Sequence, residues 1–289
     1  MNTMSNITSA VLENSIAKAS EINPVNDGDY IGSDGLIYCS KCNTRKQRRI
    51  DLLGQEKIVM VPCQCRAKEL DEEEAAEKEK YRQADVSRMK SAGFQDEAMK
   101  KWTFDNDDGK NEYIMNVAKN FVANFEDMKA KRKGLLFFGG VGVGKTYASA
   151  CIANALIEKG YPCLVTNFPR LIRTMEDLRQ GRQDFLDSLN DYQLLVIDDL
   201  ATERNTEYMQ EFVFQIIDAR QQSGLPLIVT TNLTSEELKN PQNIDKKRVY
   251  SRLMQMCVPV PVSGVDRRKT SLIDEYGEFA KILGLEARK

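Results

Sequence analysis

The sequence contains no histidine among its 289 residues. Mechanisms that need an imidazole base or an imidazole metal ligand are therefore excluded. Any catalytic acid or base must be a carboxylate, and any zinc ion must be held by thiolates. The sequence also lacks an apolar run near the roughly 20 residues that span a bilayer. Its polar start lacks the charged and apolar regions of a signal peptide, so we expect a soluble, cytoplasmic protein.

Composition narrows the class of protein further. With 42% hydrophobic and 29% charged residues, the chain is expected to form one sizeable domain plus an appendage. The formal charge of -2 argues against a surface that is basic throughout but leaves local basic patches open. Seven cysteines are an odd number in a chain without an export signal, which favours reduced thiols and metal ligation over disulfides.

One stretch matches the phosphate-binding loop pattern G-x-x-x-x-G-K-[ST] at every required position. An apolar run typical of a buried strand precedes it at residues 134–138, and apolar residues at helical spacing follow it. Glycines let backbone N–H groups turn toward a phosphate, the lysine reaches the β- and γ-phosphates, and the threonine hydroxyl binds Mg²⁺. The predicted loop consists of Gly139, Gly140, Val141, Gly142, Val143, Gly144, Lys145 and Thr146.

Two acidic residues end the apolar run at residues 194–197, in the form of a Walker B motif. Asp198 is predicted to hold the Mg²⁺ shell, and Asp199 to orient or deprotonate the attacking water. Many ATPases have glutamate at the second position. Because aspartate is shorter by one methylene, we expect hydrolysis that is slow or stimulated by a partner. A later apolar run leads to Asn232, which is placed to sense a γ-phosphate or its water.

Beyond the phosphate loop, predicted strands and helices alternate, which implies a parallel sheet with helices on both faces. A helix around residues 171–182 carries arginines on its polar side. They form either a solvated basic face or a contact for single-stranded nucleic acid. These are Arg170, Arg173, Arg179 and Arg182. Later arginines form either surface salt bridges or contacts to a γ-phosphate. They are Arg248, Arg252, Arg267 and Arg268.

Four of the cysteines form two close pairs, C-x-x-C and C-x-C, separated by a stretch that can fold as a hairpin. A tetrahedral S₄ site needs two ligands from each of two turns, so the pairs predict a zinc-ribbon-like site; the alternative is four unrelated buried cysteines. From residue 39 to residue 68, eight basic and two acidic side chains give +6, which four thiolates on one Zn²⁺ lower to about +4. This basic knob suits either nucleic acid or an acidic protein face. The predicted ligands are Cys39, Cys42, Cys63 and Cys65.

Two other segments leave alternatives open, and a third is predicted to form a single helix. Residues 1–35 are a polar arm that forms a short helix and loop, frays, or folds against a partner. Trp102 packs either near an adenine or in the core, and its apolar area favours the core. Residues 111–129 read as one long amphipathic helix.

The sequence resembles the DnaC/IstB family of AAA+ ATPases, and within it the replicative helicase loaders of the DnaC kind. The resemblance covers about residues 100–275 and rests on five motifs: GGVGVGKT (139–146), LLVIDDL (194–200), IVTTN (228–232), RVYSRL (248–253) and GVDRR (264–268). It implies an α/β, P-loop AAA+ (ASCE) fold with a reduced lid. The expected division is an arm (1–35), a zinc-ribbon-like segment (36–68), a charged helical linker (69–98) and the ATPase domain (99–289).

The resemblance also implies roles for individual residues. Asn232 would be sensor 1. Arg252 would be an arginine finger acting on a neighbour, with Arg248 as its rival, and Arg268 would be sensor 2, with Arg267 as its rival. The helix at 171–182 would be an insertion that contacts single-stranded DNA. Two departures are Ala201, where relatives often have glycine, and the short chain after Arg268, which is too short for a four-helix lid.

The function implied is that of a helicase loader using ATP, Mg²⁺ and Zn²⁺. It would assemble in a ring or spiral, bind a hexameric replicative helicase, and couple ATP turnover to loading on single-stranded DNA. Two alternatives are a transposition helper ATPase of the same family and a non-hydrolysing adapter that ATP switches on.

Overall fold

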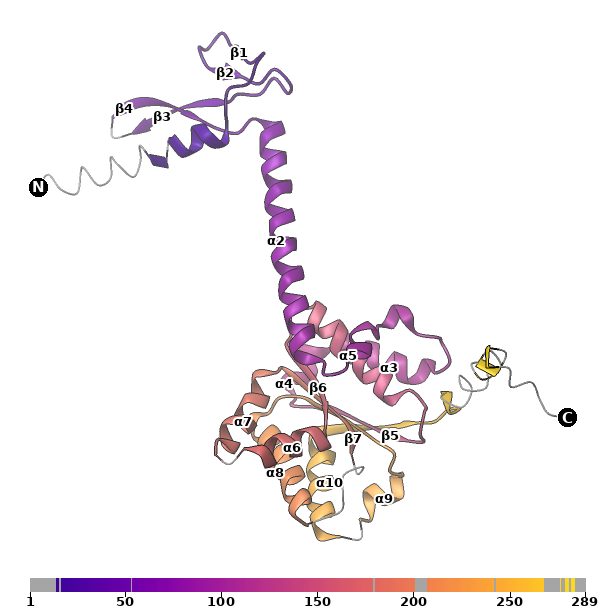
Figure 1. The fold of residues 1–289 in the computed structure, drawn as a ribbon. Coiled ribbons are helices and arrows are strands. Elements are labelled where there is room, and N and C mark those ends of the chain that lie inside the picture. The colour runs from indigo at the N-terminus through magenta and orange to yellow at the C-terminus, as the bar shows by residue number, and fades with distance from the viewer. Residues whose placement is uncertain are drawn as a thin grey trace, which may run out of the picture. The chain divides into compact units, whose positions relative to one another are not determined.

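The computed structural model describes residues 14–15, 17–52, 54–178, 180–200, 207–241, 243–267, 276, 279–280 and 282–283 (Figure 1). The chain divides into two compact units, Met1–Gln83 and Ala84–Lys289. The boundary falls inside the segment predicted as a charged linker. Across the described residues, no helix has both the length and the apolar character needed to cross a membrane.

The N-terminal unit contains two small antiparallel pairs of strands. β1 (Tyr30–Ile31) pairs with β2 (Ile37–Tyr38), and β3 (Gln47–Leu52) pairs with β4 (Gln55–Met60). The second pair is the hairpin predicted between the cysteine pairs. Its turn contains Gly54 at φ 81°, a left-handed conformation that glycine adopts without strain.

A buried ion pair ties part of the arm to this unit. Lys46 Nζ lies 2.7 Å from Asp29 Oδ2 and donates to the Pro24 carbonyl at 2.5 Å. The two side chains are 2% and 0% exposed. The frayed alternative for the arm is therefore wrong for residues 23–35. The predicted basic knob also needs correction, because Lys46 is buried against Asp29 and Arg45 pairs with Asp34 at 2.9 Å.

Helix α2 (Gln64–Gly93) confirms the predicted charged helix. It has no proline and its only glycine is the last residue, and oppositely charged neighbours such as Glu74 and Lys78 lie 2.6 Å apart at i,i+4. The helix ends where Gly93 meets the sheet: a Cβ at this position would lie 2.1 Å from the Cys163 carbonyl oxygen. Phe94, the next residue, is buried and forms a parallel bridge with Val165.

The second unit is built on a five-stranded sheet in the order β6-β7-β8-β5-β9, and every pairing is parallel, as predicted. The strands are β5 (Gly134–Gly139), β6 (Cys163–Asn167), β7 (Leu194–Leu200), β8 (Leu227–Thr231) and β9 (Cys257–Val262). β9 is an edge strand and contains Pro259 and Pro261. Proline lacks the N–H that a further strand would need, so it is tolerated at an edge and discourages strand addition there.

Helices cover both faces of this sheet, also as predicted. Alternate strand residues point to opposite faces, so Phe137 and Leu136 belong to different apolar clusters. One face carries α3 (Glu112–Ala123), α4 (Phe125–Ala130) and α5 (Lys145–Glu158). The other face carries α6 (Phe168–Asp177), α7 (Arg182–Ser188), α8 (Glu207–Ser223), α9 (Ser235–Lys239) and α10 (Ile244–Met256). Short 3₁₀ turns are η1 (Glu97–Lys101), η2 (Phe104–Asn106) and η3 (Leu189–Asp191).

Two helices predicted as single are each broken. The helix predicted at 111–129 divides at Asn124 (φ -110°, ψ 28°), whose side chain donates to the Asn120 carbonyl at 2.9 Å. This break turns Phe125 into the core, edge-on to Tyr161. The helix predicted at 171–182 ends at Asp177, and α7 begins after Gly181 at φ 82°.

A buried arginine binds the loops that precede β7 and β8. Arg220 on α8 is 1% exposed and donates hydrogen bonds to four backbone carbonyls. These belong to Leu189, Tyr192, Gln193 and Pro226. Burial lowers the pKa of Arg220 to about 9, so the side chain remains charged at neutral pH. Backbone oxygens, rather than a carboxylate, satisfy this buried charge.

Candidate nucleotide-binding site and metal centre

The predicted phosphate loop lies between β5 and α5, as the order strand, loop, helix requires. Gly142 and Gly144 have φ of 74° and 99°, in the left-handed region. A Cβ on Gly142 would meet Asp266 Oδ1 at 1.8 Å, so a larger residue is also excluded by space. This curled loop leads directly into the N-terminus of α5, whose free N–H groups favour an anion.

Lys145 meets Asn232 although 87 residues separate them. Its Nζ donates to Asn232 Oδ1 at 2.8 Å and to the carbonyls of Gly139 and Gly140 at 2.9 and 2.5 Å. The lysine is only 5% exposed. Asn232 directly follows β8, which lies beside β5 in the sheet, so the sheet order explains the contact.

The predicted Mg²⁺ ligands also meet. Thr146 Oγ1 donates to Asp198 Oδ1 and Oδ2 at 2.9 and 3.1 Å. Burial raises the pKa of the Asp198 carboxyl above its ordinary value, and the negative charge of Asp199 adds to this. Hydrogen bonds from Thr230 and Thr146 act in the opposite direction. A carboxylate and a hydroxyl are oxygen donors of the kind that Mg²⁺ prefers, so these residues fit this ion.

A cavity of about 280 Å³ brings the phosphate loop together with Asp199 and Asn232, whereas Asp198 does not line it. Its lining comprises Trp102, Val141, Gly142, Val143, Gly144, Lys145, Thr146, Tyr147, Asp199, Asn232 and Arg267. A larger cavity of about 510 Å³ lies among α9, α10 and β9 and contains no residue of the phosphate loop. The smaller cavity is therefore the candidate nucleotide site, because it alone of the two combines the loop with Asp199 and Asn232.

Trp102 occupies a position between the core and the cavity. It packs against the apolar cluster beneath α5, as predicted, and it also lines the cavity. Its ring lies 5.6 Å from that of Tyr147 at an interplanar angle of 40°. An aromatic pair beside a phosphate loop offers a flat apolar surface to a nucleotide base.

Among the late arginines that the structure describes, Arg267 alone lines the cavity. Its N–H donates to the Gly142 carbonyl at 3.1 Å, and its Nη1 lies 3.1 Å from Asp108 Oδ1. Asn111 supports the same region by donating to the carbonyls of Val143 and Ser263. Arg268 lies outside the described residues, as does Ala201.

Arg248 and Arg252 lie together on α10, and neither lines the cavity. Their guanidinium carbons are 4.3 and 4.4 Å from the centre of the Phe214 ring. Arg252 Nη2 also lies 2.6 Å from Asp218 Oδ1, whereas the carboxylate paired with Arg248, that of Asp245, lies 4.0 Å away. Arg252 is thus held in place, and Arg248 is the more exposed of the two, at 54% of its side chain.

The four arginines predicted as a DNA contact do not share one helix. Arg170 and Arg173 are exposed on α6, and Arg170 donates to Gln95 Oε1 at 2.9 Å. Arg182 begins α7, donates to the carbonyls of Met175 and Leu178, and covers the Phe212 ring at 5.2 Å. Arg179 lies outside the described residues. The single basic helix face is therefore corrected to an exposed pair on α6 and a separate Arg182.

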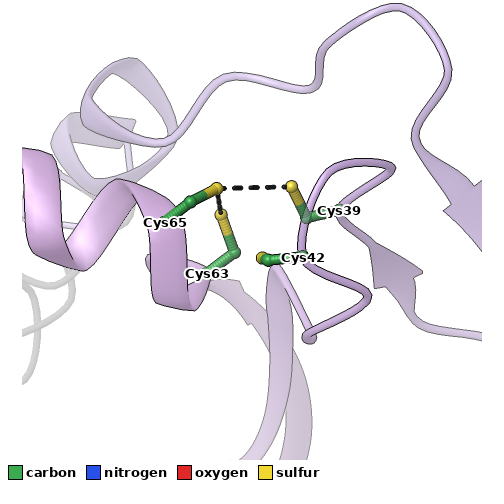
Figure 2. Close-up of side chains that lie close together, drawn as sticks. All are labelled: Cys39, Cys42, Cys63 and Cys65. Carbon is green, nitrogen blue, oxygen red and sulfur yellow. Dashed lines mark hydrogen bonds between the residues drawn. The ribbon is translucent and has the colours of Figure 1, made fainter.

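The four paired cysteines converge in the N-terminal unit (Figure 2). All four sulfurs lie within 4.8 Å of one another; Cys65 Sγ is 3.6 Å from Cys39 Sγ and 3.3 Å from Cys63 Sγ. Tetrahedral Zn–S bonds of about 2.3 Å place sulfurs roughly 3.8 Å apart, so this cluster fits Zn²⁺. The alternative of four unrelated buried cysteines is wrong.

The C-x-C spacing works because the second pair lies at the start of a helix. Cys63 immediately precedes α2, and Cys65 is in its first turn. Neighbouring sulfurs, Cys63 first, raise the pKa of Cys65 to about 12. A hydrogen bond with Thr44 is the main cause that lowers the pKa of Cys42 to about 5. A cation among four such close thiols would allow all of them to ionise.

Fold and site together define a P-loop nucleotide-binding domain of the AAA+ type. The sequence pattern of the family described as IstB-like ATP binding protein matches residues 63–271. The chain belongs to this family, which confirms the resemblance noted from its motifs.

Known relatives point to DNA replication and to mobile elements. The replicative helicase loader DnaI of Bacillus subtilis (strain 168) is 26% identical over 161 residues, covering 52% of this chain and 51% of DnaI. The replicative helicase loader DnaC of Escherichia coli (strain K12) is 27% identical over 128 residues, covering 43% and 51%. A putative insertion sequence ATP-binding protein of Sinorhizobium fredii (strain NBRC 101917 / NGR234) is 30% identical over 113 residues, covering 38% of each chain.

A solved structure agrees with the fold. The crystal structure of DnaI has 25% sequence identity and a TM-score of 0.52, over 62% of this chain and 99% of that one. The chain spans about half the length of the helicase loaders that it matches in sequence.

Several contacts were not predicted from the sequence. They are the roles of Thr230, Asp108 and Asn111 at the site, and the Asp29–Lys46 pair in the N-terminal unit. For Thr230 a signal existed, since a hydroxyl inside an otherwise apolar strand needs a partner. The others join residues that no local spacing connects.

Proposed function

We propose that this protein is an ATP-dependent loader that binds a hexameric replicative helicase and delivers it to single-stranded DNA. The observation that carries the proposal is the meeting of Lys145, Asn232 and Asp199 at one cavity with the phosphate loop. The helicase role is supported by the relatives DnaI and DnaC.

In this proposal, ATP phosphates take the place of the present partners of Lys145 Nζ. Released from the Gly139 and Gly140 carbonyls, the ammonium group would bind the β- and γ-phosphates. Bound Mg²⁺ would neutralise phosphate charge, held by Thr146 and, through its shell, by Asp198. Asp199 would then accept a proton from the attacking water, and Asn232 would register the γ-phosphate.

Arginines supply the remaining positive charge in this proposal. Arg267 is the proposed contact to the nucleotide bound by the same subunit, since it already lines the cavity. Arg268, which the family resemblance implies as sensor 2, stays a prediction. Arg252 remains the proposed trans finger, held ready by Asp218 and Phe214, with Arg248 as its more exposed rival. A trans finger requires self-assembly. Mixing Arg252→Ala with Lys145→Ala subunits should therefore restore part of the turnover that each lacks alone, and Arg248→Ala is the matched variant.

The N-terminal unit is the proposed helicase-binding part, with Zn²⁺ on Cys39, Cys42, Cys63 and Cys65. Single-stranded DNA would contact Arg170 and Arg173 on α6, with Arg179 and Arg182 as further candidates. Contacts of arginine to phosphate predict binding that tolerates any sequence and weakens with salt.

Light scattering of the protein mixed with its replicative helicase, with and without ATP, tests this function. We expect an assembly of helicase size carrying several loader subunits, lost when residues 1–90 are removed. Two separate peaks under every nucleotide condition would contradict the loader function.

A transposition helper is the second candidate, because the family is described as IstB-like and one relative is an insertion sequence protein. Binding to a transposase instead of a helicase would favour it. The third candidate, a non-hydrolysing adapter, is tested by single-turnover hydrolysis. Turnover no higher than that of Lys145→Ala with any partner would favour the adapter.

A further inference from the structure

The two acids of β7 lie at an irregularity of the sheet. Ile197 pairs with Val229 and Leu200 pairs with Thr231, so Asp198 and Asp199 together face the single residue Thr230. This is a β-bulge, with one extra residue on β7. Asp199 has φ 57°, a left-handed conformation that is uncommon for a residue with a side chain. Other contacts must therefore hold the bulge in place.

Thr230 makes those contacts with one hydroxyl. Its Oγ1 accepts the Asp199 N–H at 3.0 Å and donates to Asp198 Oδ1 at 2.5 Å. A hydroxyl has a single proton, so Thr230 donates to Asp198 alone, while its oxygen accepts from the backbone N–H of Asp199. Thr230 is 0% exposed, so water does not compete for these bonds.

Both acids depend on this hydroxyl for their direction. The bond to the Asp199 N–H fixes the backbone that carries the Asp199 side chain to the cavity. The bond to Asp198 Oδ1 lies beside that from Thr146, so two hydroxyls orient one carboxylate. Thr230 itself does not line the cavity.

We propose that Thr230 is a positioning residue. Through the bulge, its one hydroxyl orients both Asp198, the acid of the Mg²⁺ shell, and Asp199, the acid that activates water. This rests on the proposed use of ATP by the same site. Lys145 Nζ donates to Asn232 and to the Gly139 and Gly140 carbonyls, whereas the Thr230 hydroxyl bonds the two acids, so we expect phosphate binding by the loop to depend little on Thr230. Loss of the hydroxyl should therefore affect turnover and the Mg²⁺ dependence more than nucleotide affinity.

Thr230→Val and Thr230→Ser in the full chain test this. Valine keeps the shape and loses the hydroxyl, and serine keeps the hydroxyl. We expect Thr230→Val to lower kcat by about 10- to 100-fold while KM changes less than about 3-fold. We expect Thr230→Ser to stay within about 2-fold of the native protein. Thr166→Val is the matched control, since Thr166 is 4% exposed on β6 and bonds Gln95 rather than an acid.

A second readout does not require hydrolysis. Calorimetric titration of ATP with Mg²⁺ and with EDTA gives the part of the affinity that depends on the metal. Thr230→Val should reduce that part and leave the EDTA value unchanged. If native turnover equals that of Lys145→Ala, the hydrolytic function fails, yet this titration still tests Thr230.

Three results would overturn the proposal: native kcat and Mg²⁺ dependence in Thr230→Val, equal loss in Thr230→Ser, or equal loss in Thr166→Val. Thermal unfolding identifies a variant that does not fold. Thr230→Cys, with a weak thiol donor, would then take the place of valine and should show an intermediate loss.

Discussion

Two clusters of buried apolar side chains, one on each face of the sheet, stabilise the second unit, Ala84–Lys289. In the N-terminal unit, the described residues bury only three hydrophobic side chains, Leu36, Cys39 and Cys63. Apolar burial is the main favourable term in folding, and a unit with so little of it needs another source of stability. We propose that a metal ion on the cysteine cluster, together with the Asp29–Lys46 pair, supplies it. In this account one unit depends on its core, and the other on a metal site and a buried ion pair.

Metal removal should give the largest difference between the units. Structural zinc contributes on the order of 10 kcal/mol in small domains, so Cys39→Ser/Cys42→Ser or a strong chelator should unfold the N-terminal unit. The midpoint of the thermal unfolding of the second unit should not change. Amide NMR dispersion and metal content measure both effects. A metal-free N-terminal unit that keeps its dispersed spectrum would contradict this dependence.

Loss of Arg220 should lower the stability of the second unit alone. Arg220→Leu leaves four buried carbonyls without their donor, which we expect to cost about 3–5 kcal/mol. Arg248→Leu, at a site with a mostly exposed side chain, is the matched control and should cost less than about 0.5 kcal/mol. Denaturant unfolding of the two variants measures the difference. Equal losses would show that the buried hydrogen bonds contribute little.

Acid should affect Asp29 and Asp198 at different pH values, because the pKa of Asp29 is lowered and that of Asp198 is raised. The hydrogen bond from Lys46 is the largest cause that lowers the pKa of Asp29 to about 2. The stability that Asp29 contributes is therefore complete above the ordinary value of 3.8 and is lost only as pH falls through about 2. The pKa of Asp198 is raised by burial, so its proton competes with Mg²⁺ at higher pH than in an ordinary aspartate.

Mg²⁺ titrations of ATP binding between about pH 8 and about pH 5 test whether a proton on Asp198 competes with Mg²⁺. We expect the Mg²⁺-dependent affinity to fall toward acid more steeply in the native protein than in Asp198→Asn. A native affinity that falls no more steeply than that of Asp198→Asn would contradict a contribution from the Asp198 carboxyl.

A surface ion pair should have the smallest effect. Lys90 Nζ lies 2.6 Å from Glu158 Oε1 near the end of α2, and Glu158 is half exposed. Exposed pairs contribute at most about 1 kcal/mol, so Lys90→Ala should lower stability by no more than that. Phe94→Ala removes a buried ring nearby and should cost about 3–5 kcal/mol. Equal costs in thermal unfolding would mean that the end of α2 is held by charge rather than by packing.

The sequence predicted the parts of the site that local spacing defines. The loop of residues 139–146, the acids near the end of β7 and Asn232 after β8 each follow an apolar run, and parallel strands bring their ends to one edge of a sheet. The four thiols were predictable for the same reason, since each pair needs only one turn.

The remaining contacts depend on tertiary structure. A bulge leaves no mark on the pattern of β7, so the joint contact of Thr230 with both acids was not visible. The pairing of Arg267 with Asp108 joins residues far apart in sequence, and Lys46 was counted as a surface charge because Asp29 lies outside the cysteine segment. The break at Asn124, which turns Phe125 into the core, is not revealed by helical periodicity.

Separate tasks for the two units are tested most directly by two measurements on three full-length proteins: native, Cys39→Ser/Cys42→Ser and Lys145→Ala. One is the mass of the complex with the helicase, and the other is the ATP response of Trp102, the only tryptophan. We predict that the cysteine variant loses the helicase and keeps the ATP response, whereas Lys145→Ala loses the ATP response and still binds helicase. A cysteine variant that binds the helicase as the native protein does would contradict a metal-dependent N-terminal unit that recognises it.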